Sequence, residues 1–474
     1  MYAELVILKK PRPCIMMVRR VLPTVVIPLL VLFTVLYYSS FLRSSGGNLY
    51  HYINELEQYE AIRGDTLYET KAEETVALSH TTKDQPNLVL EKLMGNHLRE
   101  DCYIRILLWR NPGKEQIDLG LDHWQKAKCR NRISCNIEML YSNNLEDIAV
   151  SDIVIIMPGP FRNFVWSKLL EVRPPGQQWV LYSRESPVHE PQFSPPSTMT
   201  KENPYNFTVT YRSDSDECIT WGFYYPGEPS FAAAKRMDYT KGKSKLMTWI
   251  ASRCDPLGWE RTKIVQEIQK YLPVDTYGKC GTLDCPKRDK EQCQSLFSSY
   301  KFYLSLENSE CKEYFTEKFW SNAFVHRMIP IVYGAPKEDY ERLAPPHSFI
   351  HLEDFDTMEE FVDYIMLLDS NSTLYNKYFH WQSEGGFRSG PGHRTTLSPA
   401  GLCTIVKKMK RNSLNPELSW RYKNPDFHKW WEQSCSSREK LLGIKIKVDE
   451  PIYRENKLEG SYSAVKNGKS IATS

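Results

Sequence analysis

Two polar stretches of this chain carry residue types that could perform group transfer. The first, from Glu307 to Lys318, holds carboxylates, an amide and two ammonium groups within one short segment. In the second, Glu185 comes just after an apolar run and is followed closely by Pro187. A carboxylate can accept the proton of an attacking hydroxyl, while a cation can stabilise a departing phosphate. Together the two stretches offer a base and a leaving-group site.

The first stretch lies between two predicted buried strands. The run from Lys301 to Leu306 is rich in β-favouring residues, and the run from Ile329 to Tyr333 is a second short apolar segment, closed by Gly334. Between them Thr316 could act as N-cap for a helix through Arg327. Such a β-α-β unit binds ligands at the carboxyl ends of its strands, and the helix start favours phosphate. From spacing alone, an ordinary core unit with an exposed polar loop is an equal alternative.

The residues of this unit resemble the donor-binding signature of the α-1,3-fucosyltransferases, glycosyltransferase family 10. That signature has a Phe-Glu-Asn-Ser element, then Tyr-x-Thr-Glu-Lys and Pro-x-x-x-Gly. The matching segments here are Leu306 to Ser309, with Leu306 in place of the Phe, Tyr314 to Lys318, and Pro330 to Gly334. The resemblance covers about residues 104–435. It implies an inverting enzyme that moves L-fucose from GDP-β-L-fucose to a GlcNAc hydroxyl of a glycoprotein glycan in α-1,3 linkage.

The resemblance also implies roles for particular residues. Glu185 matches the family's catalytic base in a Glu-Ser-Pro element, although an exposed loop glutamate is by itself more commonly solvated. Lys318 and Arg261 are expected to bind the diphosphate and Tyr314 to help hold the nucleotide. The full expected donor site is Arg261, Glu307, Asn308, Tyr314, Glu317 and Lys318. The match around Arg261 is looser, and an ordinary surface helix arginine is an equal alternative there.

The segment Asp214-Ser215-Asp216 offers a different chemistry. Paired acidic residues bind Mn²⁺ and a diphosphate in metal-dependent transferases of the GT-A type, because oxygen ligands suit a hard cation. The same residues match a Tyr-Arg-x-Asp-Ser-Asp element of the resembled family, in which cationic side chains and a helix start stabilise the diphosphate instead. We therefore expect no catalytic metal and no required cofactor, with Mn²⁺ at most a stimulator. A catalytically silent glycan-binding membrane protein is a further alternative.

The amino terminus predicts the compartment. Residues 21–42 form a run of 22 residues without a charge, long enough to cross a bilayer as a signal-anchor. Five Lys or Arg residues precede the run and only Arg43 follows closely, which predicts a cytosolic tail over residues 1–20 and a lumenal remainder. A cleaved signal peptide is the alternative. Family analogy favours the Golgi membrane, with single-pass type II topology, over the endoplasmic reticulum.

Cysteines and glycosylation triplets agree with a lumenal setting. Eleven of the twelve cysteines follow the apolar run, so disulfides are expected, with their connectivity left open. Asn206 and Asn371 each begin an N-glycosylation triplet. The net charge of +3 gives no basic field, so nucleic acid is not an expected partner. The expected partners are GDP-fucose, a GlcNAc-containing glycan or glycoprotein, and a membrane contacted through residues 21–42.

Strand and helix signals divide the remaining chain into two α/β halves. Residues 43–100 are polar and predict a stem. Residues 101–240 predict an acceptor-side Rossmann-like domain, and residues 241–437 a GDP-fucose-binding Rossmann-like domain. Residues 438–474 predict a disordered tail. The resemblance implies the GT-B architecture, in which two such domains face a cleft. The acceptor stays open between the N-glycan core GlcNAc, an outer N-acetyllactosamine and a protein.

Overall fold

The described part of the chain begins at residue 92. The computed structural model describes residues 92–93, 99–110, 116–117, 120–129, 134–157, 165–194, 203–227, 237–254, 258–285, 295–390 and 396–447, all of which belong to one compact unit. The predicted cytosolic tail, the apolar run at 21–42 and most of the predicted stem lie outside the described residues, as does the part of the predicted tail after residue 447. The prediction of a disordered tail over residues 438–474 is wrong for its first part, because residues 440–441 and 444–445 pair as strands and Leu441 and Ile446 are buried. Among the residues that are described, no helix is long and apolar enough to cross a membrane.

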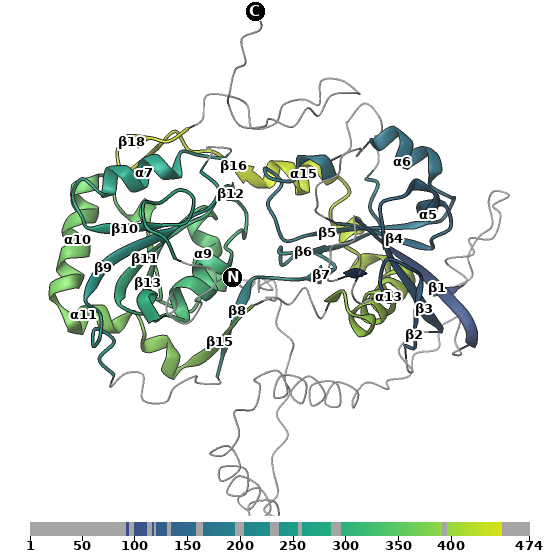
Figure 1. Cartoon of the computed structure of the whole chain (residues 1–474), viewed down its shortest axis with the longest axis horizontal. Coiled ribbons are helices and arrows are strands. Elements are labelled where there is room, and N and C mark those ends of the chain that lie inside the picture. The colour runs from purple at the N-terminus through teal and green to yellow at the C-terminus, as the bar shows by residue number, and fades with distance from the viewer. Residues whose placement is uncertain are drawn as a thin grey trace, which may run out of the picture. The chain divides into compact units, whose positions relative to one another are not determined.

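The first of two large sheets has seven strands in the order β2-β3-β1-β4-β5-β6-β7 (Figure 1). Its strands are β1 (Arg99–Trp109), β2 (Gln125–Ala127), β3 (Cys135–Ser142), β4 (Ile153–Ile156), β5 (Gln178–Ser183), β6 (Phe207–Thr210) and β7 (Glu217–Cys218). Neighbouring strands run parallel except β2 and β3. Alternate residues of β1 enter different buried clusters, Ile106 and Leu108 in one, Leu107 and Trp109 in the other. Both faces are therefore covered, which explains the continuous apolar runs.

The second sheet has five strands, all parallel, in the order β10-β9-β11-β13-β14. Its strands are β9 (Lys245–Ile250), β10 (Val274–Tyr277), β11 (Tyr300–Leu306), β13 (Ile329–Tyr333) and β14 (Ile350–His351). Helices α7 (Arg261–Ile268), α10 (Met358–Ser370) and α11 (Ser372–Lys377) share one buried cluster with it, and α9 (Lys337–Leu343) shares another. The predicted strands at Lys301 to Leu306 and Ile329 to Tyr333 are confirmed as β11 and β13. The expected mixed α/β fold with two parallel-rich sheets is confirmed as well.

Shorter elements complete the two halves. On the first sheet lie α5 (Leu145–Ala149) and α6 (Trp166–Val172), whose apolar residues join Leu107 in one cluster. The other short helices are η1 (Pro191–Phe193), η3 (Lys318–Phe324), η4 (Leu352–Asp354), η5 (His380–Ser383), η6 (Pro416–Leu418), α14 (Trp420–Lys423), α15 (Phe427–Trp430) and η7 (Glu432–Ser434). The short strands pair as β8 (Gly222–Pro226) with β15 (Gly385–Ser389), β12 (Glu310–Cys311) with β16 (Cys435–Ser436), and β17 (Lys440–Leu441) with β18 (Ile444–Lys445).

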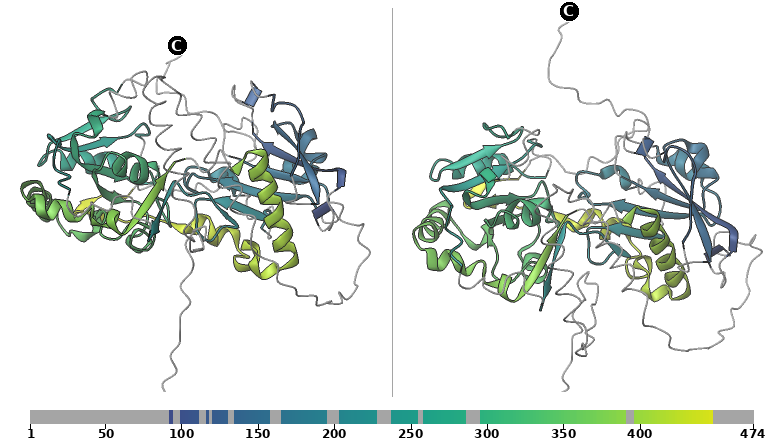
Figure 2. Two further views of the ribbon diagram at one scale, coloured as in Figure 1. Left: turned by 90° about the horizontal axis from the view of Figure 1, so that it is seen from below. Right: turned by 60° about the horizontal axis from the view of Figure 1, so that its bottom comes forward.

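After the second sheet the chain returns to the first (Figure 2). Helix α13 (Pro399–Leu414) buries Leu402, Ile405 and Met409 in the same cluster as β1 residues. Farther along, Trp420 and Trp430 enter the cluster on the other face. The structure thus differs from the sequence-based division, which assigned all of residues 241–437 to the second domain. The apolar stripe of α13 predicts burial, but the sequence does not indicate which sheet provides it.

Disulfides connect both neighbouring and distant segments of the chain. Among the described residues the bonded pairs are Cys102–Cys135, Cys129–Cys403, Cys254–Cys280 and Cys311–Cys435. The second pair attaches α13 to the first half of the chain. The fourth joins β12, in the polar loop after β11, to β16. The disulfides expected from a lumenal setting are therefore present, with a connectivity that cysteine spacing left open.

Candidate active site

The loop after β5 positions Glu185. β5 ends at Ser183, whose hydroxyl accepts a hydrogen bond from the Glu185 backbone N–H at 3.0 Å. Glu185 thus sits just past the carboxyl end of a strand, the edge where open α/β sheets bind ligands. Its Oε1 accepts hydrogen bonds from Asn308 Nδ2 at 3.2 Å and from the Tyr314 hydroxyl. Both donors belong to the polar loop after β11, so two segments distant in sequence meet at this carboxylate.

The surroundings of Glu185 favour its ionised form. Burial alone would raise the pKa of this carboxyl group. The hydrogen bond from Tyr314, the nearby His189 ring and the hydrogen bond from Asn308 together outweigh burial, so the pKa of Glu185 lies below its usual value. A partly buried carboxylate that stays ionised at neutral pH is suited to accept a proton from a hydroxyl.

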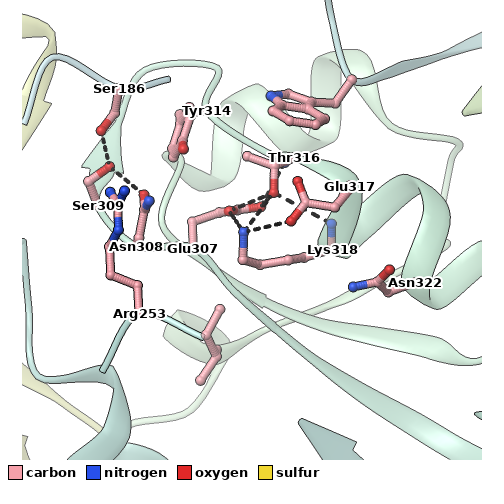
Figure 3. A network of polar contacts seen from close by, with 12 residues as sticks. Ser186, Arg253, Glu307, Asn308, Ser309, Tyr314, Thr316, Glu317, Lys318 and Asn322 are labelled. Atoms are coloured by element: carbon pink, nitrogen blue, oxygen red, sulfur yellow. Dashed lines mark hydrogen bonds and ion pairs between the residues drawn. The ribbon is translucent and has the colours of Figure 1, made fainter. Parts of the chain in front are cut away.

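Further contacts hold the two loops together. The Ser309 hydroxyl donates to Ser186 Oγ at 2.7 Å (Figure 3). A ring nitrogen of His189, Nε2, lies 3.4 Å from the Asn308 backbone oxygen. The loop that carries Glu185 is therefore also held to the polar loop through Ser186 and His189, which both follow Glu185 in the chain.

Glu307 forms the centre of a second polar network (Figure 3). It follows β11 directly and is fully buried. Its carboxylate accepts the Thr316 backbone N–H at 2.7 Å and pairs with Lys318 Nζ at 3.0 Å. Gly334 makes this approach possible, because a Cβ there would lie 2.6 Å from Glu307 Cβ. Burial raises the pKa of Glu307 and the Lys318 charge opposes the rise. Glu307 consequently positions its neighbours and presents no surface of its own to a ligand.

The Lys318 ammonium group already has three acceptors. They are Glu307 Oε2 at 3.0 Å, Thr316 Oγ1 at 2.9 Å and Glu317 Oε1 at 3.3 Å. Burial would lower the pKa of Lys318, but the two carboxylates raise it, so the group stays charged. Because an ammonium group has three N–H donors, any further acceptor, such as a phosphate oxygen, could bind Lys318 only by replacing one of these three. The Glu317 side chain is 42% exposed and makes the longest contact, so it is the acceptor most easily replaced.

The predicted α-helix from Thr316 through Arg327 is wrong in type and extent. The structure has instead a π-helix, η3, from Lys318 to Phe324, without a side-chain cap. The Thr316 hydroxyl contacts Glu307 and Lys318 instead of capping a helix. Phe319 and other aromatic side chains of η3 fill a buried cluster. Single π-helical turns occur frequently at functional sites, which agrees with the position of this one.

Arg261 begins a helix as expected, but its guanidinium group already donates hydrogen bonds to backbone oxygens. It begins α7 and is buried, with Nη1 3.2 Å from the Leu306 backbone oxygen and Nη2 on the Arg253 backbone oxygen. These contacts bring it to the carboxyl end of β11. Of the expected site residues, the structure thus unites Glu185, Asn308 and Tyr314 in one network, and Glu307, Glu317 and Lys318 in another.

Sequence reasoning missed two ionisable residues near Glu185, Arg253 and Glu190. Arg253 follows β9, and its side chain points toward Asn308 and Ser309 (Figure 3). Its charge acts on Glu185 and on Glu190, which lies five residues further along the chain. Burial and the Glu185 charge raise the pKa of Glu190 to about 8, so Glu190 keeps its proton at neutral pH. The position of Arg253 after a predicted strand was the signal that could have identified it.

The two aspartates considered for metal binding make separate protein contacts. Asp214 accepts two hydrogen bonds from the Arg212 guanidinium group, at 3.0 and 2.7 Å. Asp216 accepts the backbone N–H groups of Thr208 at 2.9 Å and of Trp420 at 2.8 Å. Within the described ranges, no cluster of three or more His, Cys, Asp or Glu residues could hold a metal ion. Asp216 thereby links β6 to the returning carboxy-terminal segment.

Both predicted glycosylation asparagines have structural contacts. Asn206 Oδ1 accepts hydrogen bonds from Arg173 Nη2 and from the Trp179 backbone N–H, each at 2.9 Å. Asn371 Oδ1 caps α11 by accepting the Leu374 N–H at 3.1 Å. Glycosylation of either side chain stays a prediction.

Comparison with known proteins gives matches in both halves of the chain. Residues 240–430 match the family model described as glycosyltransferase family 10 (fucosyltransferase) C-term, and residues 103–222 match the model described as fucosyltransferase, N-terminal. The chain is 33% identical to glycoprotein 3-alpha-L-fucosyltransferase A of Drosophila melanogaster over 339 residues, which are 70% of this chain and 61% of that protein.

Other relatives are similar over shorter stretches. Identity to alpha-(1,3)-fucosyltransferase 4 of Homo sapiens is 33% over 251 residues, 52% of this chain and 44% of that protein. Identity to 4-galactosyl-N-acetylglucosaminide 3-alpha-L-fucosyltransferase 9 of Rattus norvegicus is 37% over 215 residues, 45% of this chain and 55% of that protein. The chain therefore spans less than two thirds of the length of these relatives. A crystal structure of an alpha1,3-fucosyltransferase with GDP-fucose aligns with a TM-score of 0.41 at 17% identity, covering 69% of this chain and 97% of that one.

Proposed function

Since the chain belongs to the α-1,3-fucosyltransferases of glycosyltransferase family 10, we propose that it transfers L-fucose from GDP-β-L-fucose to a GlcNAc hydroxyl of a glycoprotein glycan in α-1,3 linkage. The observation that carries this proposal is the ionised Glu185 carboxylate, which accepts hydrogen bonds from Asn308 and Tyr314. These donors lie in the loop that leads into the Lys318 network. Residues 308–318 thus contact Glu185 at one end and contain Lys318 at the other.

We assign proton transfer to Glu185 in a single displacement. The acceptor hydroxyl oxygen forms a bond to the anomeric carbon of fucose as its proton passes to Glu185. The bond between that carbon and the GDP oxygen breaks on the opposite face, and its electron pair leaves with GDP. The β-linked donor therefore gives an α-linked product, and no covalent enzyme intermediate forms.

We assign Lys318 to the departing diphosphate. Its ammonium group is charged, and Glu317 can give up its contact to a phosphate oxygen. Arg253 is the second cation of this assignment, because its side chain points toward the Asn308 loop, whereas the Arg261 guanidinium group contacts backbone oxygens. Charge-assisted contacts of this kind stabilise negative charge as it develops on a leaving group.

The remaining expectations form part of the same proposal. The two sheets correspond to the two Rossmann-like domains of a GT-B enzyme. Residues 21–42 anchor the protein in the Golgi membrane with its catalytic part in the lumen, and the reaction requires no metal. The contacts of Asp214 and Asp216 with protein groups support this view over a metal-dependent GT-A reaction.

A transfer assay with linkage analysis tests the proposal. Full-length protein is incubated with GDP-fucose and acceptors that present an N-glycan core GlcNAc, an outer N-acetyllactosamine or a peptide. We expect α-1,3-fucosylated product and released GDP for at least one glycan acceptor, with rates unchanged in EDTA. Absence of both products with every acceptor would support a catalytically silent glycan-binding protein, and loss of activity in EDTA would support the metal-dependent alternative.

A further inference from the structure

We infer that Glu313 is a positioning residue, which holds Tyr314 within hydrogen-bonding reach of Glu185, and that a disulfide of the same loop supports it. The inference rests on the proposed function, because it takes Glu185 as the base. Glu313 belongs to the polar loop after β11 and immediately precedes Tyr314, whose hydroxyl donates a hydrogen bond to Glu185 Oε1. Glu313 acts through Tyr314, so it needs no contact with a substrate.

The Glu313 carboxylate joins the polar loop to the first half of the chain. It accepts hydrogen bonds from the Ser213 backbone N–H at 2.5 Å and from the Ser213 hydroxyl at 2.6 Å. Ser213 lies 100 residues earlier in the chain, just after β6, the strand that pairs with β5. The Glu313 side chain is 3% exposed, so water competes little for these bonds. The residue next to Tyr314 is thus bound to the sheet that carries Glu185.

The ring of Tyr314 is held by the same segment of the first half. The Tyr211 ring contacts the Tyr314 ring edge-on, with centroids 5.0 Å apart, and both rings are buried. Tyr211 and Ser213 belong to one short stretch after β6. The ring of Tyr314 and the side chain of its neighbour are therefore fixed together. A tyrosine with a fixed ring presents its hydroxyl to Glu185 at little ordering cost.

The second half fixes Glu313 from the other side. The Glu313 backbone N–H donates to Asp339 Oδ2 at 2.7 Å, and the Arg342 guanidinium group pairs with both carboxylates. Asp339 and Arg342 belong to α9. The φ angle of Glu313 is +58°, a left-handed conformation that is unfavourable for a residue with a side chain. Such a conformation persists where surrounding contacts determine it, and both halves supply those contacts here.

The Cys311–Cys435 disulfide holds the same loop at a second point. Cys311 lies in β12, which pairs with β16, and the Lys312 backbone N–H donates to the Ser434 backbone oxygen at 2.9 Å. The Tyr314 backbone N–H in turn donates to the Cys311 backbone oxygen at 3.1 Å. A covalent bond three residues before Tyr314 therefore limits the movement of its backbone.

The segment that precedes Cys435 is anchored on the first half. Trp430 and Trp431 enter the buried cluster that contains β5 residues. The Arg212 guanidinium group donates to the Trp430 backbone oxygen and lies 4.7 Å from the centre of the Trp430 ring. The disulfide thus connects the polar loop, through this segment, to the half that carries Glu185. Both the Glu313 contact and the disulfide end at Tyr314.

A loosened loop should change the titration of Glu185. Burial raises the pKa of Glu185 and the hydrogen bond from Tyr314 lowers it, so loss of that bond should raise the pKa. The other ionisable groups near Glu185 are His189 and Glu190 on its own loop and Arg253 after β9. Neither the Glu313 contact nor the disulfide joins the segments that carry these groups. Activity is lost as pH falls through the pKa of the base, so the acid limb of the kcat profile should move to higher pH.

Glu313→Gln tests the inference with a side chain of the same shape. The amide has a single acceptor oxygen with two lone pairs, so at least one of the three hydrogen bonds from Ser213 and Arg342 is lost. We expect the acid limb of the kcat profile to move to higher pH. We also expect kcat at neutral pH to fall about threefold, less than the loss of a whole hydrogen bond to a charged group would cause. GDP affinity should stay within about twofold, because Lys318 keeps its three acceptors.

A variant without the disulfide tests the same positioning by a different route. Replacement of Cys311 and Cys435 by serine should move the acid limb in the same direction. Replacement of Cys102 and Cys135 by serine is the matched control, because that disulfide lies within the first half. The control should lower thermal stability and leave the pH profile in place. Glu341→Gln, at an exposed position of α9, is the control for Glu313→Gln and should behave like the unaltered protein.

Thermal unfolding shows which variants are folded, and either folded variant decides the inference. An acid limb that stays in place would overturn it. So would a fall in GDP affinity equal to the fall in kcat, which would mean that the whole loop is displaced. If the unaltered protein transfers no fucose, the proposed function fails and hydrogen exchange decides the inference instead. We then expect faster exchange of the backbone N–H groups of residues 184–190 in the two test variants than in the controls, and equal exchange would overturn the inference.

Discussion

The two charged centres of the candidate site are held in opposite ways. Glu185 accepts hydrogen bonds from Asn308 and Tyr314, which are 123 and 129 residues away in the chain. Lys318 is satisfied by Glu307, Thr316 and Glu317, all within eleven residues of it. The hydrogen bonds of Glu185 therefore form only when both halves are assembled, whereas the contacts of Lys318 are complete within a single loop. Changes at the base should affect turnover, and changes at the cation centre should affect donor affinity and stability together.

The strongest test of this contrast is Glu185→Gln. The amide cannot accept the acceptor proton, so kcat should fall by about 10²–10⁴-fold, the usual contribution of a general base. GDP-fucose affinity should stay within about twofold, which equilibrium titration measures. Glu171→Gln, at an exposed position of α6, is the control and should leave both quantities unchanged. Loss of donor affinity in Glu185→Gln would remove Glu185 from the role of base.

Lys318→Ala tests the cation centre. It leaves the buried Glu307 carboxylate without its partner ion, which typically destabilises a protein by about 3–5 kcal/mol. GDP affinity should also fall by about 10- to 100-fold, because a charge-assisted contact to phosphate is lost. Thermal unfolding and GDP titration measure the two effects. Lys337→Ala, at a more exposed pair with Asp354, should change neither by a comparable amount. Unchanged GDP affinity in a folded Lys318→Ala protein would contradict the phosphate assignment.

Tyr314→Phe tests whether the second half positions the base. The change removes a hydrogen bond that lowers the pKa of Glu185, so that pKa should rise. Activity is lost as pH falls through the pKa of the base, so the acid limb of the kcat profile should move to higher pH. We also expect kcat at neutral pH to fall about tenfold, the effect of one lost hydrogen bond to a charged group.

Tyr340→Phe provides a matched control for that variant. Tyr340 is also buried, and its hydroxyl has no hydrogen-bond partner among the described residues. Its removal should therefore leave the pH profile in place. A profile of Tyr314→Phe that coincides with the unaltered protein would show that the base does not depend on this contact.

Glu190→Gln should have the smallest effect. Burial raises the pKa of Glu190 from 4.5 to about 8, so its contribution to stability is full below pH 4.5 and is lost as pH rises through about 8. The glutamine variant does not titrate and should lose less stability across this range. Thermal unfolding at pH 5, 7 and 9 should show a smaller decline for Glu190→Gln than for the unaltered protein, whereas the exposed Glu146→Gln should behave like the latter. Parallel declines in all three proteins would mean that Glu190 is ionised throughout.

The sequence was sufficient to locate the strands and the loops that carry the site. β13 has the predicted limits, and Glu185 follows β5 as expected, because apolar runs closed by turn residues depend only on local signals. The π-helix could not be predicted. Thr316, the expected N-cap, instead donates hydrogen bonds to Glu307, which lies before the predicted helix, and no local helix signal indicates that contact. The hydrogen-bond partners of Glu185 could not be predicted either, because Asn308 and Tyr314 contact it only in the folded protein, across 123 and 129 residues of sequence.

The return of α13 to the first sheet has a consequence for synthesis of the protein. Its residues complete a core begun by β1, and Cys403 pairs with Cys129 across a separation of 274 residues. Domains usually fold in order as the chain emerges from the ribosome. Here the α13 residues that complete this core are made only after nearly the whole second half has been translated. The nascent protein must therefore keep the apolar residues of that core, and the thiol of Cys129, protected while the second half is made.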